Sequence, residues 1–321
     1  MAKEKNKKKG CLIAVIAVVV IGVIAAAAGG GKKKDDSSSQ SNGKVSVSSS
    51  TSSENQGKVN TDKESKSAEN GDVSEEANDV IYDDGGIKIT YTGYTASKMF
   101  TSASLNFLIE NNSDKNITVE NFNLNINGYT LDTWFYEQVP ASKKSNVKMD
   151  IYDTQLKENG IDTLGTVDMN FRCIDSDTYD ELFITNDIEI VFDETVSSEE
   201  NLDDYQLVVD QDDVQVYYKG LDHDGWISDT SFKFLIVNNS NRNVTLSADN
   251  ISVNDFAMST LFHGDCAAGK KTNETIDVYK STIEDNNIEK ITKLEFSLRC
   301  YDSDTYDDIW ETNAITIEIT E

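Results

Sequence analysis

The chain has 321 residues, with 57 acidic and 29 basic side chains, two histidines and one proline. Residues 1–34 carry eight Lys and one Glu, so the rest of the chain holds 56 acidic and 21 basic side chains. An exterior that acidic repels phosphate backbones, and we therefore expect no nucleic acid as a partner. With only two histidines, the chain has few side chains suited to acid–base catalysis or zinc binding, which argues against an enzyme.

An apolar run near the N-terminus predicts a lysine-flanked transmembrane anchor over residues 1–34. Residues 11–28 are uncharged and just long enough to span a bilayer. Five Lys precede this run and three follow it, and the positive-inside rule then places the N-terminus in the cytoplasm and the C-terminal domains outside the cell. The alternative is a cleaved signal peptide, because Ala26-Ala27-Ala28 resembles a small-residue cleavage site.

Residues 35–78 have the composition of a disordered linker. Thirteen of these 44 residues are Ser and none is aromatic. Such a segment cannot bury enough apolar surface to offset the entropy lost on ordering. We expect a flexible stalk that holds the following domains away from the membrane.

The remainder of the chain is an internal duplication with a constant offset of 127 residues. FLIENNSDKNITV at Phe107 returns as FLIVNNSNRNVTL at Phe234, and RCIDSDTYD at Arg172 returns as RCYDSDTYD at Arg299. The constant offset predicts two domains with the same strand order. We place them at residues 79–194 and 204–321.

Each copy shows the alternation of a strand with one buried face. Apolar residues alternate with polar ones at Val167, Met169, Phe171 and Cys173 in the first copy and at Leu294, Phe296, Leu298 and Cys300 in the second. This pattern predicts an all-β fold in which Arg172 and Arg299 point away from the core.

The turns and the short helix between the strands also repeat. Asn127-Gly128 and Asn254-Asp255 mark matching tight turns. A short helical turn is expected once per copy, ending at Gly160 or Asn287, which tolerate the left-handed conformation. Ser281 and Glu284 have the spacing of a capping box.

The order of these parts resembles that of telokin-like, immunoglobulin-like domains on membrane-anchored surface proteins of Gram-positive bacteria. ENNSDKNITV and VNNSNRNVTL resemble an early strand and turn of that family, and CIDSDTYDELF and CYDSDTYDDIW resemble its final hairpin. The resemblance implies two tandem immunoglobulin-like antiparallel β-sandwiches and implies no activity. The chain departs from antibody-type domains because its early strands lack Cys and the tyrosine corner is missing.

The repeated acidic string is the main candidate for a metal site. Clustered carboxylates can supply the six to eight oxygens that calcium takes, but the spacing is not that of an EF-hand loop. The preferred interpretation is a structural turn whose charges are solvated, with calcium as the alternative cofactor. The candidate ligands are Asp175, Asp177, Asp180, Glu181, Asp302, Asp304, Asp307 and Asp308.

The thiols and histidines give weaker signals. Cys173 and Cys300 fall on the apolar phase of their strands, which predicts buried thiols. A Cys266–Cys300 disulfide is the alternative in an exported domain. His263, Asp265 and Cys266 lie together in HGDC, but the aligned segment of the first copy has neither His nor Cys, which argues against catalysis there.

These features predict a single-pass membrane protein with extracellular domains and a non-catalytic role in binding or organising the bacterial cell envelope. The expected partners are cell-wall glycan or another surface protein, together with the membrane through residues 11–28. The alternative function is a calcium-dependent adhesion or sensing module.

Overall fold

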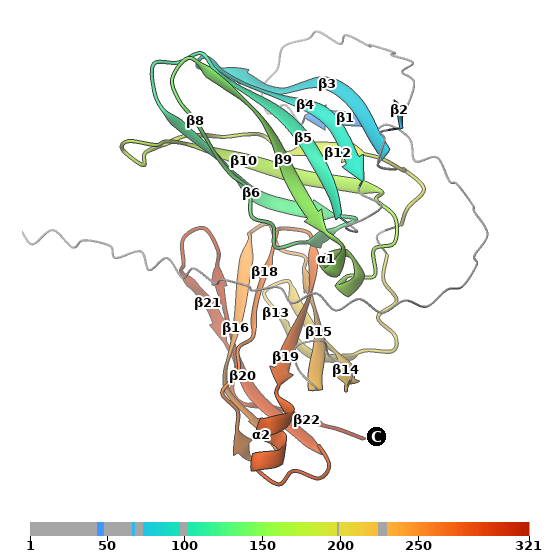
Figure 1. The fold of residues 1–321 in the computed structure, drawn as a ribbon. Helices are drawn as coiled ribbons and strands as arrows, with labels where there is room; N and C mark the ends of the chain where they lie inside the picture. The colour runs from blue at the N-terminus through green and yellow to red at the C-terminus, as the bar shows by residue number, and fades with distance from the viewer. Residues whose placement is uncertain are drawn as a thin grey trace, which may run out of the picture. The chain divides into compact units, whose positions relative to one another are not determined.

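The computed structural model describes residues 44–47, 66–67, 73–96, 102–197, 199–223 and 230–320. Over these residues the fold is all-β, with mostly antiparallel strands and two short helices (Figure 1). No helix within these ranges is both long and apolar enough to cross a membrane. The anchor predicted at residues 11–28 lies outside the described residues.

The first copy, called copy 1, begins at Val73, earlier than the predicted boundary at residue 79. Its strands are β3 (Val73–Asp84), β4 (Ile87–Ala96), β5 (Ser102–Asn111), β6 (Ile117–Ile126), β7 (Tyr129–Thr130), β8 (Tyr136–Val139), β9 (Lys143–Tyr152), β10 (Thr166–Asp175), β11 (Glu181–Ile184) and β12 (Ile188–Val191). β3, β4, β5 and β9 pair in that order, and β10 pairs with β6, β11 and β12. β8 pairs with β6.

The second copy, called copy 2, repeats this order 127 positions later. Its strands are β13 (Gln206–Gln211), β14 (Val214–Asp222), β15 (Thr230–Asn238), β16 (Val244–Val253), β17 (Phe256–Ala257), β18 (His263–Cys266), β19 (Lys271–Val278), β20 (Lys293–Asp302), β21 (Asp308–Glu311) and β22 (Ile315–Glu318). β13, β14, β15 and β19 pair in that order, while β20 pairs with β16, β21 and β22. The offset of 127 residues between the duplicated sequences therefore also relates the matching strands.

Two short strands are described within residues 35–78. β1 (Lys44–Val47) pairs with β12, and β2 (Lys66–Ser67) pairs with β3. An unpaired strand edge presents a row of free backbone groups, and β1 supplies partners to the edge of β12. These two short strands lie within the range proposed as a linker.

Aromatic side chains from facing strands meet inside each copy. In copy 1 Phe107 of β5 meets Phe171 of β10 edge to face, with ring centroids 5.1 Å apart. In copy 2 Phe234 of β15 meets Phe296 of β20 at 5.5 Å. All four rings are buried. Each copy therefore has a sandwich-like core, and the predicted apolar phase of β10 and β20 is confirmed.

The predicted turns are present, but the predicted helix cap is not. Asn127 and Gly128 both have positive φ, as do Asn254 and Asp255, which is the backbone of a tight type I′ hairpin turn. The helices are α1 (Asp153–Glu158) and α2 (Lys280–Asp285), and Gly160 and Asn287 beyond them are left-handed.

The capping box expected at Ser281 and Glu284 is wrong. Helix α2 begins two residues too early for it, because its N-cap is Tyr279 and not Ser281. Tyr279 is extended and makes no side-chain capping bond. Ser281 is therefore inside the helix, where it cannot cap the N-terminus.

The shared NNS string is explained by one buried amide per copy. Asn111 is fully buried and donates to the carbonyls of Lys115 and Val139 at 2.8 and 2.9 Å, while its carbonyl accepts from the backbone and hydroxyl of Ser113. Asn238 makes the same type of contacts with Arg242, Cys266 and Ser240. A buried amide needs such partners, so this string holds the turn after β5 or β15 to the neighbouring strand.

Residues of both copies contribute to one polar joint. The Glu200 carboxylate, in the segment between the copies, accepts hydrogen bonds from the hydroxyls of Tyr129 and Tyr205 and from the Lys219 ammonium group. Burial raises the pKa of Glu200, but these donors outweigh it, and the pKa lies below the usual value. Lys271 of β19 also pairs with Tyr129 of β7 as a parallel bridge.

Candidate functional site

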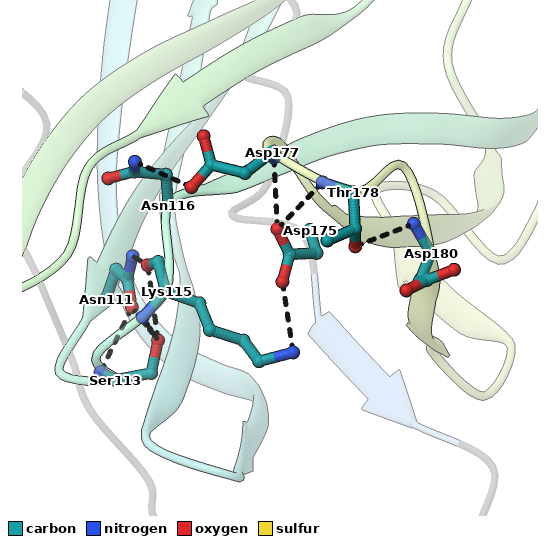
Figure 2. A network of polar contacts seen from close by, with 8 residues as sticks. All are labelled: Asn111, Ser113, Lys115, Asn116, Asp175, Asp177, Thr178 and Asp180. Atoms are coloured by element: carbon teal, nitrogen blue, oxygen red, sulfur yellow. Dashed lines mark hydrogen bonds and ion pairs between the residues drawn. The ribbon is translucent and has the colours of Figure 1, made fainter.

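The acidic string of copy 1 forms a turn between β10 and β11 that is built around one carboxylate. Asp175 accepts the backbone N–H groups of Asp177 and Thr178 at 3.0 and 3.3 Å (Figure 2). The Lys115 ammonium group lies 3.0 Å from the same carboxylate. The hydrogen bond and charge of Lys115 hold the pKa of Asp175 below its usual value. Tyr179, at the turn, has a positive φ and an exposed ring.

Two of the other carboxylates of this turn, those of Asp177 and Glu181, have partners of their own. Asp177 accepts from the Asn116 amide at 3.1 Å, and Glu181 accepts from Arg172 Nε at 3.0 Å. The backbone N–H of Asp180 lies 3.4 Å from the Thr178 hydroxyl. Figure 2 shows the carboxylates of Asp175 and Asp177 directed to different partners, whereas Asp180 is linked to Thr178 through its backbone N–H.

Copy 2 builds the same turn. Asp302 accepts the N–H groups of Asp304 and Thr305, both at 3.0 Å, and these backbone donors lower its pKa. Asp308 pairs with Arg299. The bond from Asn243 to Asp304 is longer than its counterpart in copy 1, at 3.4 Å. The Asp307 backbone N–H lies 3.4 Å from the Thr305 hydroxyl, as in copy 1.

Most of the carboxylates of the two turns, which are the candidate calcium ligands, have other contacts. Over the described residues, no group of three or more His, Cys, Asp or Glu side chains is placed to hold a metal ion. In each turn the first carboxylate, of Asp175 or Asp302, accepts hydrogen bonds from the backbone of the turn. The last carboxylate, of Glu181 or Asp308, accepts a hydrogen bond from an arginine. The geometry is that of a turn cap, and the repetition of the string follows from the repetition of the turn.

The thiols lie in the interior and are not bonded to each other. Cys173, Cys266 and Cys300 are buried and free, and burial raises the pKa of each thiol to about 12. Cys266 lies on β18 opposite Val244, and Cys300 lies on β20 opposite Leu246.

The Cys266–Cys300 disulfide considered from the sequence is therefore not formed. β18 and β20 flank β16 on opposite sides, and two strand spacings amount to roughly 9–10 Å. A disulfide needs Cα atoms within about 7 Å. Cys266 and Cys300 cannot meet without breaking the pairing of β16.

The HGDC segment does not assemble a nucleophile. Along β18 His263 and Asp265 are exposed, whereas Gly264 and Cys266 are buried, so His263 and Cys266 point to opposite faces of the strand. His263 Nε2 lies 3.8 Å from the Asp265 carboxylate. A base on one face cannot activate a thiol on the other.

An exposed aromatic pair, Trp134 and Tyr136, is the surface feature that the sequence interpretation missed. Trp134 is 85% exposed and Tyr136 44%. Their rings are nearly parallel, with centroids 6.4 Å apart and an angle of 25° between the planes. The Gln138 amide donates to the Tyr136 hydroxyl at 3.0 Å.

The residue between them fixes this pair in place. Phe135 is buried and contacts Phe171, with ring centroids 5.5 Å apart, and its backbone N–H donates to the Asn121 side chain at 2.9 Å. In copy 2 the aligned Phe262 is likewise buried, but its flanking residues are Leu261 and His263. The fold thus needs the central Phe and not the flanking aromatic rings.

A cavity of about 300 Å³ reaches Thr133, the residue directly before Trp134, although neither Trp134 nor Tyr136 lines it. Its wall includes Asn121, Phe122, Asn123, Asp132 and Thr133 of copy 1 and part of β18 and β19 of copy 2. The described residues that line it include no Lys or Arg. An anionic ligand would find no counter-charge in this cavity.

Glu274 of copy 2 also borders the cavity. Burial, and then the charge of Asp132, raises its pKa to about 8. Copy 1 has the buried Val147 at the aligned position of β9. A Cβ on Gly264 would lie 2.5 Å from Glu274 Cγ, so the missing side chain at Gly264 makes room for the carboxyl group.

Comparison with known proteins does not assign this chain to a family. No family model and no curated protein matches the chain. A solved protein of unknown function from Porphyromonas gingivalis W83 is similar at 12% identity, covering 73% of this chain and 98% of its own, with a TM-score of 0.22. A GH2 beta-galacturonidase from Eisenbergiella tayi, solved with galacturonate, shares 10% identity over 81% of this chain and 44% of its own, with a TM-score of 0.19.

A third solved structure is similar at the same level. The tandem CBM22-1-CBM22-2 domains of Paenibacillus barcinonensis Xyn10C share 11% identity over 77% of this chain and 99% of their own, with a TM-score of 0.12. All three TM-scores are too low to carry an argument. The function must be argued from the residues of this chain.

Proposed function

We propose that this chain is a non-catalytic surface protein that binds at the bacterial cell envelope through copy 1. In this proposal residues 1–34 anchor it in the membrane, and two immunoglobulin-like β-sandwiches lie outside the cell. The observation that carries the proposal is the exposed pair of Trp134 and Tyr136. Large exposed aromatic side chains are enriched where proteins bind partners.

The duplication provides an internal control for this argument. Copy 2 folds in the same strand order with Leu261 and His263 in place of the pair. Folding therefore does not account for Trp134 and Tyr136, and this supports the proposal that they contact a partner.

Calcium-dependent adhesion or sensing is the weaker alternative. It would require the carboxylates of the repeated turns to converge on an ion. Asp175 and Asp302 instead cap their own backbone, and Glu181 and Asp308 pair with arginines. These contacts favour the aromatic pair over the acidic turns as the binding surface.

Co-sedimentation with isolated cell envelopes tests the proposal. We expect the purified full chain to sediment with the envelopes and Trp134→Ala to reduce the bound fraction strongly. Leu261→Ala is the matched control, because Leu261 is 86% exposed at the aligned position of copy 2. Binding that is absent in the wild type, or that Trp134→Ala and Leu261→Ala reduce equally, would contradict the proposal.

A further inference from the structure

We propose that Trp134 and Tyr136 bind the pyranose rings of a neutral polysaccharide. This inference deepens the proposed envelope binding and rests on it. It names the chemical class of the ligand from the aromatic pair, the neighbouring cavity and the charge of the chain.

The aromatic pair exposes two nearly parallel rings to solvent. Trp134 and Tyr136 are inclined by only 25° and both rings are exposed. The face of an aromatic ring carries negative charge density, which attracts the weakly positive C–H groups on the flat side of a pyranose ring. Stacking of this kind requires rings held in place, and the buried Phe135 between them holds both.

The adjoining cavity supplies groups that suit sugar hydroxyls. Thr133, directly before Trp134, lines it together with Asn121, Asn123 and Asp132. Amides both donate and accept hydrogen bonds, and carboxylates accept them. A hydroxyl also donates and accepts, so a sugar that stacks on the pair finds partners of matching chemistry beside it.

Charge decides between neutral and anionic polymers. The described residues that line the cavity include no Lys or Arg, but they include Asp132, Asp265 and Asp304. Glu274 also lines it, but its raised pKa of about 8 means that it adds little negative charge at neutral pH. Beyond residue 34 the chain carries 56 acidic and 21 basic side chains. Phosphate, sulfate and uronate polymers would be repelled, which leaves a neutral glycan.

Isothermal titration calorimetry of the purified full chain tests this inference with defined probes. The neutral probes are cellohexaose and the hexamer of N-acetylglucosamine, and the anionic probe is hexagalacturonate. We expect a neutral hexamer to bind and hexagalacturonate not to bind. Trp134→Ala and Tyr136→Ala should each weaken binding by about tenfold or more, as for an aromatic anchor, whereas Leu261→Ala should leave it unchanged.

Iodide quenching of tryptophan fluorescence in a Trp226→Phe chain provides a second measurement, because the sequence has three Trp. Of the two that remain, Trp134 is exposed and Trp310 is buried, so a bound neutral hexamer should reduce the quenching by covering Trp134. Absence of binding by both neutral hexamers, equal binding of hexagalacturonate, or full binding by Trp134→Ala would each overturn the inference.

These outcomes separate this inference from the proposed function. Envelope binding that depends on Trp134 but is not competed by either neutral hexamer would leave the proposed function in place and overturn the glycan inference. A protein or peptide partner would then be the ligand of the aromatic pair. Loss of envelope binding itself would overturn both.

Discussion

The Lys115 ammonium group lies 3.0 Å from the Asp175 carboxylate and joins the turn before β6 to the turn after β10. The same carboxylate accepts two backbone N–H groups of its own turn. One side chain thus caps a turn and ties it to a second turn. This dual contact gives Asp175 a structural role in the hairpin.

The first prediction separates the turn from calcium binding. Asp175→Ala and Asp302→Ala should lower the melting temperature, because each removes the acceptor of two backbone donors. Asp177→Asn and Asp304→Asn should barely change it, since Asn supplies a similar side chain. Millimolar calcium should not raise the melting temperature of the wild type. A clear calcium-dependent rise that Asp177→Asn and Asp304→Asn abolish would restore the calcium interpretation.

The second prediction concerns the two faces of the late strands. Phe171→Asp and Leu298→Asp should destabilise the protein by several kcal/mol, because each buries an unpaired charge in a core. Arg172→Ala should cost much less, since Arg172 is partly exposed and its ion pairs with Glu120 and Glu181 lie at the surface. Urea unfolding measures both. Equal losses would show that the faces are assigned wrongly.

The third prediction concerns the pH dependence that Glu274 confers. The folded chain keeps the Glu274 proton up to about pH 8, whereas the unfolded chain releases it near 4.5. Between these values the folded state binds one proton more, so this group lowers stability as pH rises. The charges of Asp132, Asp265, Glu158 and Asp277 act in the same direction.

Glu274→Val should therefore raise the melting temperature at pH 8 and change it much less at pH 5. Glu289→Gln, at an exposed position, is the control and should leave the melting profile unchanged. A gain for Glu274→Val that is equal at both pH values would contradict the burial of the Glu274 carboxyl group.

The fourth prediction concerns the independence of the copies. Each copy has its own aromatic core, so residues 73–194 and 204–321 expressed separately should both show β-type circular dichroism and cooperative melting. In the full chain Glu200→Ala should lower the stability by about 1–3 kcal/mol, because it removes the acceptor of Tyr129, Tyr205 and Lys219. A copy that stays unfolded alone would show that the two share a core.

The fifth prediction concerns topology. Protease added to intact cells should digest the two copies and leave a small membrane-bound fragment that contains residues 11–28. The physical reason is the excess of Lys before that apolar run. A full-length chain that survives on intact cells and is digested only after permeabilisation would reverse the proposed orientation.

Sequence periodicity predicted the parts of the fold that follow from burial. Phe171 and Leu298 were placed inward because a strand alternates its faces, and Asn127-Gly128 was placed in a turn because both residues accept positive φ. The cap at Ser281 failed because helix α2 begins at Lys280 after an extended Tyr279. Local spacing does not determine the residue at which a helix starts.

The surface was harder to predict than the core. Trp134, Phe135 and Tyr136 form an uninterrupted aromatic run, and periodicity alone does not show which ring is buried. Comparison of the copies would have found it, because Leu261-Phe262-His263 keeps only the central Phe. The Cys266–Cys300 disulfide considered from the sequence was wrong for a different reason, because β16 lies between the strands that carry the two cysteines. The spacing of two cysteines in the sequence does not reveal the order of strands in a sheet.

The exchange of Val147 for Glu274 also protects the chain against assembling wrongly. Neighbouring domains of similar sequence are prone to swapping strands during folding, and β9 and β19 are the matching strands of the two copies. If β19 were to take the place of β9, Glu274 would enter an apolar site shaped for Val147, without the room that Gly264 provides. Pairing of β9 and β19 each within its own copy is therefore more stable than pairing in which the two strands are exchanged.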